Sequence, residues 1–162
     1  MKMDDRLFRN AMGNFATGIT VITTEAEGKE HGMTANAFMS VSLNPKLVTI
    51  SIGNNAKMLN YIKQAKKYAV SFLAEDQQEV SMLFAGQIKD GRHYEFGRLN
   101  GMPVIEEALV NLTCNVVSEY GAGDHTLFIG EVTEMSSKEG DPLLYFKGKH
   151  HDLHESKQTA ER

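Results

Sequence analysis

Hydrophobic and polar residues alternate most clearly over residues 47–53, where valine and isoleucine occupy every second position and hydroxyl residues lie between them. A period of two predicts a half-buried strand. Asn44-Pro45 indicates a turn before this strand. We therefore expect residues 31–58 to form two strands joined by that turn, followed by a helix that Asn55 caps.

The N-terminal segment has a helical rather than an alternating pattern. Asp4 or Asp5 can cap a first helix, and Gly18 is expected to end it. Apolar residues recur there at helical spacing, which predicts a stripe buried against the rest of the protein. The residues of this stripe are Leu7, Phe8, Met12 and Phe15.

Two further helices are expected downstream. The helix after Asn55 would bury an apolar face that includes Leu59 and Ile62. A capping-box-like sequence, Asp76-Gln-Gln-Glu79, predicts the start of a third helix. The loop over residues 86–100 is long for a connection without secondary structure, and such loops are often functional.

The remaining strands are expected at residues 19–24, 68–74, 109–117, 126–135 and 142–146, followed by a polar tail from residue 147. The chain shows no strand–helix–strand alternation with a dinucleotide fingerprint, because Gly121-Ala-Gly123 precedes a strand rather than a helix. We therefore predict a mainly β fold, a small closed or split antiparallel β-barrel with a few short helices, in one domain over residues 1–162.

Composition narrows the class of protein. The 162 residues are 41% hydrophobic and 23% charged, which is typical of one globular domain. The net charge of −4 gives no electrostatic support for nucleic-acid binding. No apolar run is long enough to span a membrane, and no secretion signal is visible. The single cysteine, Cys114, is expected in the core and is consistent with the cytoplasm.

Two features suggest a flat, phosphorylated ligand. Small and hydroxyl residues are concentrated over residues 34–42, where they would let a flat ring approach the backbone and would hydrogen-bond its polar edge. Lys57 lies in the first turn of a predicted helix, where the helix dipole disfavours a cation. A bound phosphate at that helix terminus would remove the conflict. An ordinary polar strand end and a solvated lysine are the alternatives.

Six segments together resemble the short-chain flavin reductases, small proteins that often serve as reductase components of two-component monooxygenases. The two most specific segments are GMTANAFMSVSLNPKLVTISI (32–52) and GDHTLFIGEV (123–132). Supporting segments lie at 10–24, 68–86, 101–116 and 142–150, so the resemblance covers roughly residues 8–150. It implies a split β-barrel, a homodimer, and reduction of FMN or FAD by NAD(P)H, with the reduced flavin passed to a partner monooxygenase.

The resemblance also implies site residues. His125, oriented by Asp124, would position the nicotinamide or hydrogen-bond the flavin edge, and Lys149 would meet a nucleotide phosphate. The flavin ring and ribityl chain would be lined by Thr34, Ala35, Asn36, Ala37, Ser40, Val41 and Ser42, with Phe84 and Ala85 nearby. The ribityl–phosphate side would be lined by Ser51, Ile52, Gly53, Ala56 and Lys57. Many relatives carry a hydroxyl residue near position 56 or 58, where this chain has Ala56 and Met58.

Other interpretations stay open at this point. A tight FMN-binding electron-transfer or sensor protein would use the same residues without releasing its flavin. A pyridoxamine-phosphate-oxidase-like barrel would want a more basic phosphate pocket. The histidine-rich sequence that includes His150, His151, Asp152 and His154 is weak evidence for a metal, and we predict no metal site.

Overall fold

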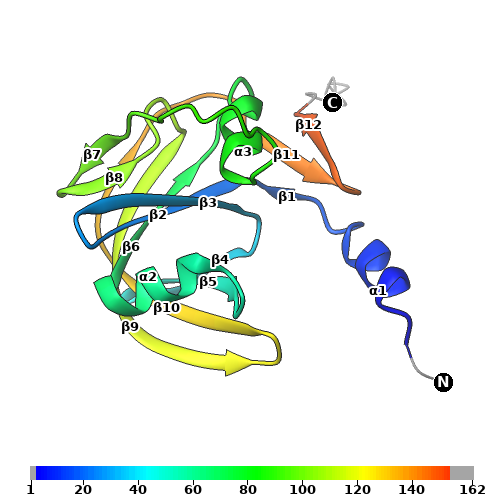
Figure 1. Ribbon diagram of the computed structural model, residues 1–162, viewed down its shortest axis with the longest axis horizontal. Coiled ribbons are helices and arrows are strands. Elements are labelled where there is room, and N and C mark those ends of the chain that lie inside the picture. The colour runs from blue at the N-terminus through cyan, green and yellow to red at the C-terminus, as the bar shows by residue number, and fades with distance from the viewer. Residues whose placement is uncertain (1–2, 154–162) are drawn as a thin grey trace, which may run out of the picture.

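Seven antiparallel strands form the main sheet of the computed structural model, which describes residues 3–153 (Figure 1). In spatial order they are β3 (Lys29–Ala35), β2 (Thr20–Ala26), β6 (Lys67–Phe72), β9 (Val110–Ala122), β10 (His125–Ser137), β5 (Lys46–Gly53) and β4 (Phe38–Leu43). The sheet is strongly curved around its core, which confirms the predicted antiparallel barrel.

Smaller elements surround the main sheet. A three-stranded sheet contains β1 (Thr17–Gly18), β11 (Leu143–Phe146) and β12 (Lys149–Asp152), and a hairpin contains β7 (Gly97–Leu99) and β8 (Met102–Val104). The helices are α1 (Asp5–Met12), α2 (Lys57–Ala65) and α3 (Gln78–Phe84). No helix within residues 3–153 is long and apolar enough to cross a membrane.

Strand β2 separates two hydrophobic clusters. Ile22 faces the barrel interior, where it packs with residues such as Ile50 and with Ile62 of α2. Val21 points to the opposite face and packs with Leu73 and Leu143. Both faces of β2 are therefore buried, which explains why its sequence is apolar or β-branched at almost every position rather than alternating.

Close packing at Gly130 fixes part of the barrel interior. A Cβ atom at this position would lie 2.3 Å from the Tyr68 hydroxyl oxygen and 2.8 Å from Cys114 Cβ. Only glycine leaves this space, so the aromatic ring of Tyr68 can lie directly against β10. Cys114 is fully buried, and burial raises the pKa of its thiol to about 12. The prediction that Cys114 is a core residue is confirmed.

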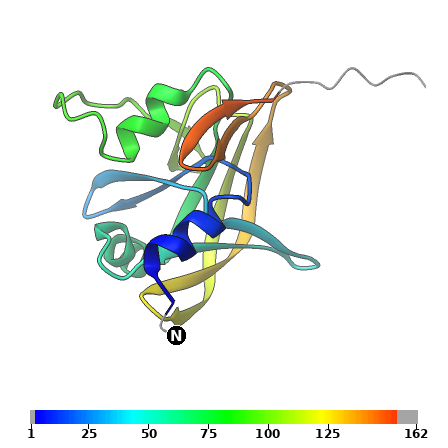
Figure 2. The ribbon, with the colours of Figure 1, turned by 90° about the vertical axis from the view of Figure 1, so that its right-hand side faces the viewer.

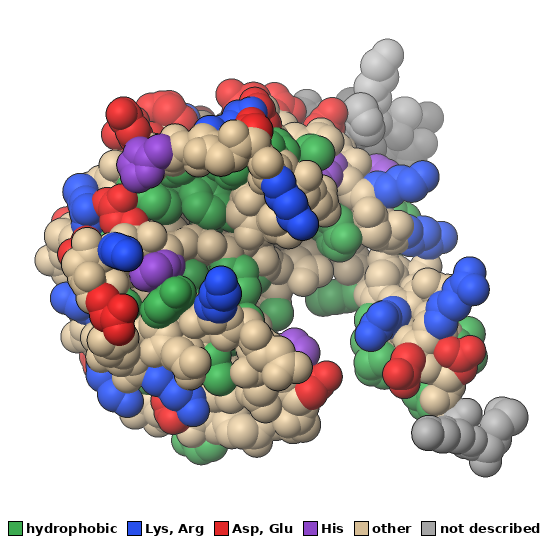
Figure 3. Space-filling model, in the orientation of Figure 1, with side chains coloured by type: hydrophobic (Ala, Val, Ile, Leu, Met, Phe, Trp, Pro, Cys, Tyr) green, Lys and Arg blue, Asp and Glu red, His purple; other side chains and the backbone are tan. Residues whose placement is uncertain are grey.

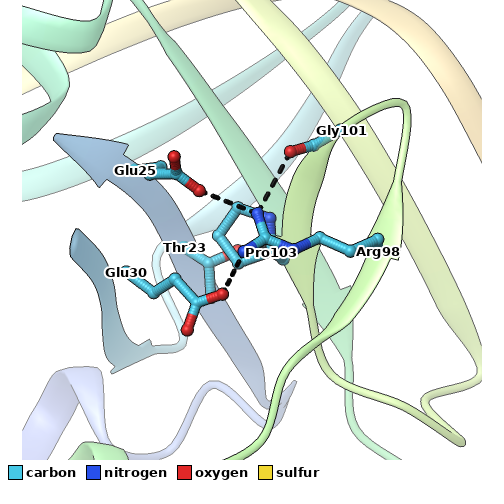
Figure 4. Close-up of polar contacts among 6 residues, drawn as sticks. All are labelled: Thr23, Glu25, Glu30, Arg98, Gly101 and Pro103. Atoms are coloured by element: carbon cyan, nitrogen blue, oxygen red, sulfur yellow. Dashed lines mark hydrogen bonds and ion pairs between the residues drawn. The ribbon is translucent and has the colours of Figure 1, made fainter. Parts of the chain in front are cut away.

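An arginine holds two hairpins together on the surface (Figure 4). The Arg98 guanidinium contacts the carboxylates of Glu25 and Glu30 and donates to the Gly101 carbonyl oxygen at 3.2 Å. Beneath it, the Thr23 hydroxyl donates to the Pro103 carbonyl. Because the Arg98 side chain is about half exposed, each ion pair contributes only about 0–1 kcal/mol to stability. The cluster therefore positions the β7–β8 hairpin more than it stabilises the fold.

The helix boundaries differ from the predictions. Asp4 caps α1 as expected, but the helix ends at Met12 with Gly13 as its C-cap, well before Gly18. Ala56, not Asn55, is the N-cap of α2, and Gln77, not Asp76, is the N-cap of α3. The Gln77 side chain instead accepts from Ala74 N and donates to the Glu106 carbonyl, so a tertiary contact determined this boundary.

The apolar stripe of α1 is exposed in the single chain, contrary to the prediction. Leu7 is 66% exposed, Phe8 49%, Met12 56% and Phe15 78%. Figures 1 and 3 show α1 as a separate lobe that stands away from the barrel. Helical periodicity correctly identified an apolar face, but no other part of residues 3–153 covers it.

The strand predictions were correct in position and too few in number. Residues 31–58 contain most of β3 as well as β4 and β5, which the Asn44-Pro45 turn connects. Strands β9 and β10 have 13 residues each and extend beyond their predicted ends. Residues 149–152, expected to be part of a polar tail, form β12 and pair with β11. His154 lies outside the described residues.

Candidate functional site

The Asp124–His125 turn lies beside the N-terminus of α2. It connects β9 to β10, and His125 is paired with Gly53 at the end of β5. Asn54 joins the two segments, since its backbone N–H donates to the Asp124 carbonyl at 2.9 Å and its side-chain oxygen accepts from the Thr126 hydroxyl at 2.8 Å. The β5–α2 connection and the Gly-Asp-His turn therefore form one surface.

The His125 ring is oriented by its neighbour. Its Nδ1 atom lies 2.7 Å from Asp124 Oδ1. This hydrogen bond is the main reason that the pKa of Asp124 lies below its usual value, so the carboxylate is charged at neutral pH. The His125 side chain is 48% exposed. With Nδ1 facing Asp124, Nε2 lies on the far side of the ring, where a ligand could reach it.

The start of α2 presents a cation without a compensating acidic residue. Among the described residues, no side chain caps this helix, and no acidic residue lies in its first turn. Lys57 is the first helical residue and is exposed, whereas Met58 is buried in the core. The helix terminus and Lys57 together are suited to an anion.

A second part of the site surrounds the end of β3. A cavity of about 190 Å³ is lined by four of the predicted residues, Thr34, Ala35, Asn36 and Ala85. It is also lined by residues that the sequence analysis did not assign to a flavin site: Ile19, Ser81, Gln87, Tyr145 and His150. Four of the residues that were predicted to line the flavin ring therefore lie at one depression, with walls from α3 and the C-terminal hairpin.

A chain of hydroxyl groups connects these walls. The Thr34 hydroxyl donates to the Ser81 carbonyl at 2.7 Å, and Ser81 Oγ lies 3.1 Å from His150 Nε2. Ser81 is 2% exposed. Ser81 precedes the apolar Phe84 by three residues, which places both on one side of the predicted helix. This spacing was a usable signal, because buried hydroxyl groups need hydrogen-bond partners. His150 offered no such signal, since its partner lies 69 residues away.

A neighbouring cavity of about 380 Å³ shares Ile19 and Asn36 with the first cavity. Its walls include Phe38 and Phe72 and the segment that leads from α1 into β2. Asn36 is exposed and lies at the junction of the two cavities. The two depressions together have the size of a small-molecule site, with an apolar part and a polar part.

The other predicted residues occupy different positions. Ser40, Val41 and Ser42 lie on edge strand β4, where the register shifts against β5 between Ser40 and Ser42. Ser51 N donates to the Ala37 carbonyl at 3.3 Å, which connects the cavity region to β5. The Ile52 side chain is fully buried, so only its backbone can face a ligand.

Phe84 and Lys149 are not among the residues that line the 190 Å³ cavity. The Phe84 ring packs against Gly32, where a Cβ atom would lie 2.5 Å from it, and against Tyr94 and Phe96. It lines a different depression of about 660 Å³, next to Arg92 and Arg98. Lys149 is exposed at the start of β12.

His150 and His151 lie in successive positions on β12, so their side chains point to opposite faces. His150 contacts Ser81, whereas the His151 ring lies 5.9 Å from that of Phe146. Alternation along the strand therefore separates the two histidines. Within residues 3–153 no group of three acidic, histidine or cysteine side chains is arranged to hold a metal.

Comparisons with known proteins place this arrangement in context. The model of the "Flavin reductase like domain" family matches residues 12–154. An NADH-dependent flavin reductase of Rhodococcus sp is 45% identical over 148 residues, which are 90% of this chain and 84% of that protein. The reductase component of 4-hydroxyphenylacetate 3-monooxygenase from Thermus thermophilus is 41% identical over 141 residues, covering 86% of this chain and 91% of that protein.

A solved structure, flavin reductase PheA2 in its native state, superimposes with a TM-score of 0.92 at 63% sequence identity. The match covers 94% of this chain and 100% of that chain. Both the sequence and the backbone arrangement are therefore shared over nearly the whole chain.

Proposed function

Because the chain belongs to the flavin reductase-like domain family, we propose that it binds FMN or FAD, reduces it with NADH, and supplies the reduced flavin to a monooxygenase. It is an oxidoreductase of the NADH-dependent flavin reductase type. Its relatives include a flavin reductase and the reductase component of a monooxygenase, which favours this function over that of a flavoprotein that retains its flavin. The observation that carries the proposal is the pair of cavities that meet at Asn36, close to the β5 segment that leads to Lys57 and His125.

The chain's residues are suited to a reaction whose chemistry the cofactor supplies: a bound flavin accepts a hydride from the nicotinamide. Such a transfer needs two stacked rings and little acid–base help. Thr34, Ala35 and Asn36 present small and polar groups to one ring. Backbone amides and the Asn36 side chain can donate to its polar edge, and the apolar walls of the larger cavity exclude water.

We propose the following roles around these rings. The N-terminus of α2, with Ala56 and Lys57, binds the flavin phosphate, and Gly53 lets the ribityl chain pass close to the backbone. His125 holds the nicotinamide through Nε2, while Asp124 holds the ring of His125 through Nδ1. Lys149 contacts a nucleotide phosphate. We further propose a cytoplasmic location, where NADH is available and a single cysteine stays reduced.

The direct test is to mix the protein anaerobically with NADH or NADPH in the presence of FMN or FAD and to record the flavin absorbance over time. We expect rapid bleaching with NADH, quenching of flavin fluorescence on binding, and a higher melting temperature at saturating flavin. Stoichiometric flavin that survives gel filtration, together with slow NADH oxidation, would instead support the flavin-retaining alternative. No change in fluorescence or melting temperature would overturn flavin binding altogether.

We propose that the functional unit is a homodimer. Exposed apolar side chains occur on α1 and again on β4, where Met39 is 58% exposed and Leu43 81%. In Figure 2, which views the molecule from the side of α1, the β4–β5 hairpin projects beyond the sheet. A second copy of the chain would bury both groups of side chains and would cover one side of the cavities near Asn36.

Phe8→Gln should weaken dimerisation by about tenfold, because a half-exposed aromatic side chain still has apolar surface to bury against a partner. Analytical ultracentrifugation over a range of protein concentrations measures the dissociation constant. Arg6→Gln introduces the same side chain on the same helix without removing apolar surface, so it should leave the constant unchanged. A wild-type protein that sediments as a monomer at all concentrations would refute the dimer.

A further inference from the structure

A cavity of about 520 Å³ lies between α1 and the turn that connects β11 to β12. Its lining consists of two cations, two amides and two glycines: Arg9, Asn10, Gly13, Asn14, Lys147 and Gly148. In Figure 3, Lys and Arg side chains lie on the α1 lobe and on the part of the body above it. The overall net charge is −4, so this concentration of positive charge is local.

The walls of the cavity are held in place by the backbone. Lys147 N donates to the Gly13 carbonyl at 2.8 Å, which attaches α1 to the β11–β12 turn. Lys147 and Gly148 both have positive φ angles, 49° and 75°, so the chain makes a tight left-handed turn there. The Asn14 side chain donates to the Asn10 carbonyl at 2.9 Å.

Neither cation at this cavity is in an ion pair within residues 3–153, and the Lys147 Nζ atom lies 5.2 Å from the centre of the Phe146 ring. Elsewhere in the described chain Arg92, Arg98 and Lys138 form ion pairs with carboxylates. Over the same residues, 3–153, neither Arg9 nor Lys147 has a carboxylate within 4.0 Å. No carboxylate lines the cavity among these residues. A positively charged depression with amide groups is suited to phosphate oxygens.

The cavity lies beside the two cavities of the proposed site. Tyr145 and His150, on either side of the β11–β12 turn, line the 190 Å³ cavity. Phe15, the residue after Asn14, lines the 380 Å³ cavity. A dinucleotide whose nicotinamide is held at His125 could therefore extend its other end toward α1.

We propose, on the basis of the proposed function, that this cavity binds the pyrophosphate of NADH. The FAD pyrophosphate includes the flavin's own phosphate, which the proposed function assigns to the N-terminus of α2, so the nicotinamide dinucleotide is the ligand that remains for this cavity. Arg9 and Lys147 would bind the phosphate oxygens, and the Asn10 side chain would donate to them. α1 would thereby contribute to the binding of the nicotinamide dinucleotide.

The test uses ADP as the probe, with the full chain and three variants. Arg9→Gln keeps a good helix-forming residue, and Lys147→Asn removes the charge with a residue that tolerates positive φ. Arg6→Gln removes a cation from the same helix at a position outside the cavity. By isothermal titration calorimetry, each cavity variant should bind ADP about tenfold more weakly than wild type, and Arg6→Gln should match wild type. Added salt should weaken ADP binding to wild type more than to the variants.

FMN affinity, measured by the quenching of flavin fluorescence, should be unchanged in all variants. An unchanged affinity shows that the variants fold. A higher KM for NADH in the cavity variants, with FMN as acceptor, assigns the pyrophosphate group to NADH. If wild type reduces FMN but does not bind ADP, if the KM for NADH does not change, or if the variants lose FAD affinity instead, this proposal is wrong while the proposed function stands. A change in oligomeric state without a change in ADP affinity also overturns it, since a second copy would then occupy the cavity.

Discussion

Lys57→Ala should weaken FMN binding by roughly ten- to a hundred-fold and leave riboflavin binding almost unchanged. A hydrogen bond to a charged group contributes roughly 1.5–3 kcal/mol, and about 1.4 kcal/mol corresponds to one decade of affinity. Lys57 is the first residue of α2, a position where the helix dipole opposes a cation. The flavin phosphate would compensate for the charge of Lys57 and for the positive end of the helix dipole. Riboflavin has no phosphate, so it reports any loss that is not due to this contact.

The measurement is a fluorescence titration of FMN and riboflavin into wild type and variant in one buffer. Lys63→Ala is the matched control, because Lys63 lies in the last turn of the same helix and is 3.8 Å from Glu119. It should leave both affinities unchanged. Added salt should weaken the wild-type FMN complex more than that of Lys57→Ala. Equal losses for FMN and riboflavin would mean that Lys57 supports the β5–α2 connection rather than the phosphate.

His125→Ala should slow flavin reduction by roughly tenfold or more while flavin affinity stays within a few fold of wild type. The His125 side chain is about half exposed and packs against no hydrophobic cluster of the described chain, so its loss should not unfold the protein. Its Nδ1 atom is held by Asp124, which leaves Nε2 to position the nicotinamide. The expected loss therefore appears in the hydride step and not in the flavin complex.

Anaerobic stopped-flow mixing with NADH at several concentrations separates the rate of reduction from nicotinamide affinity. His93→Ala is the control, because His93 is an exposed histidine that lines the separate 660 Å³ depression. It should reduce flavin at the wild-type rate. Asp124→Asn should have a smaller effect than His125→Ala, since the amide oxygen can still accept from Nδ1–H. An unchanged reduction rate in His125→Ala would exclude this residue from the hydride step, and a lower melting temperature would indicate a structural role.

Features that depend on neighbours in the sequence were predicted correctly. The alternation over residues 47–53 placed Ile50 and Ile52 in the core, and Asp4 was identified as the cap of α1. His125 and Asp124 are adjacent residues, so their contact needed no knowledge of the fold. Errors occurred at helix boundaries, and at α3 a local signal competed with the distant contact between Gln77 and Glu106. Asn55 and Asp76 are good caps by type, but α2 begins after Ala56, and α3 begins after Gln77.

The sequence by itself determined the class of fold, the strand that faces the core and the family, and it identified four residues that line the 190 Å³ cavity. These depend on periodicity and on short segments whose order is enough to specify them. Only the tertiary structure decided which distant residues share a cavity. Thr34 meets Ser81 across 47 residues, and Ser81 meets His150 across 69, because α3 and the β11–β12 hairpin pack against the same side of β2 and β3. The sequence likewise could not show that the apolar stripe of α1 is exposed, because periodicity identifies an apolar face but not the surface that covers it.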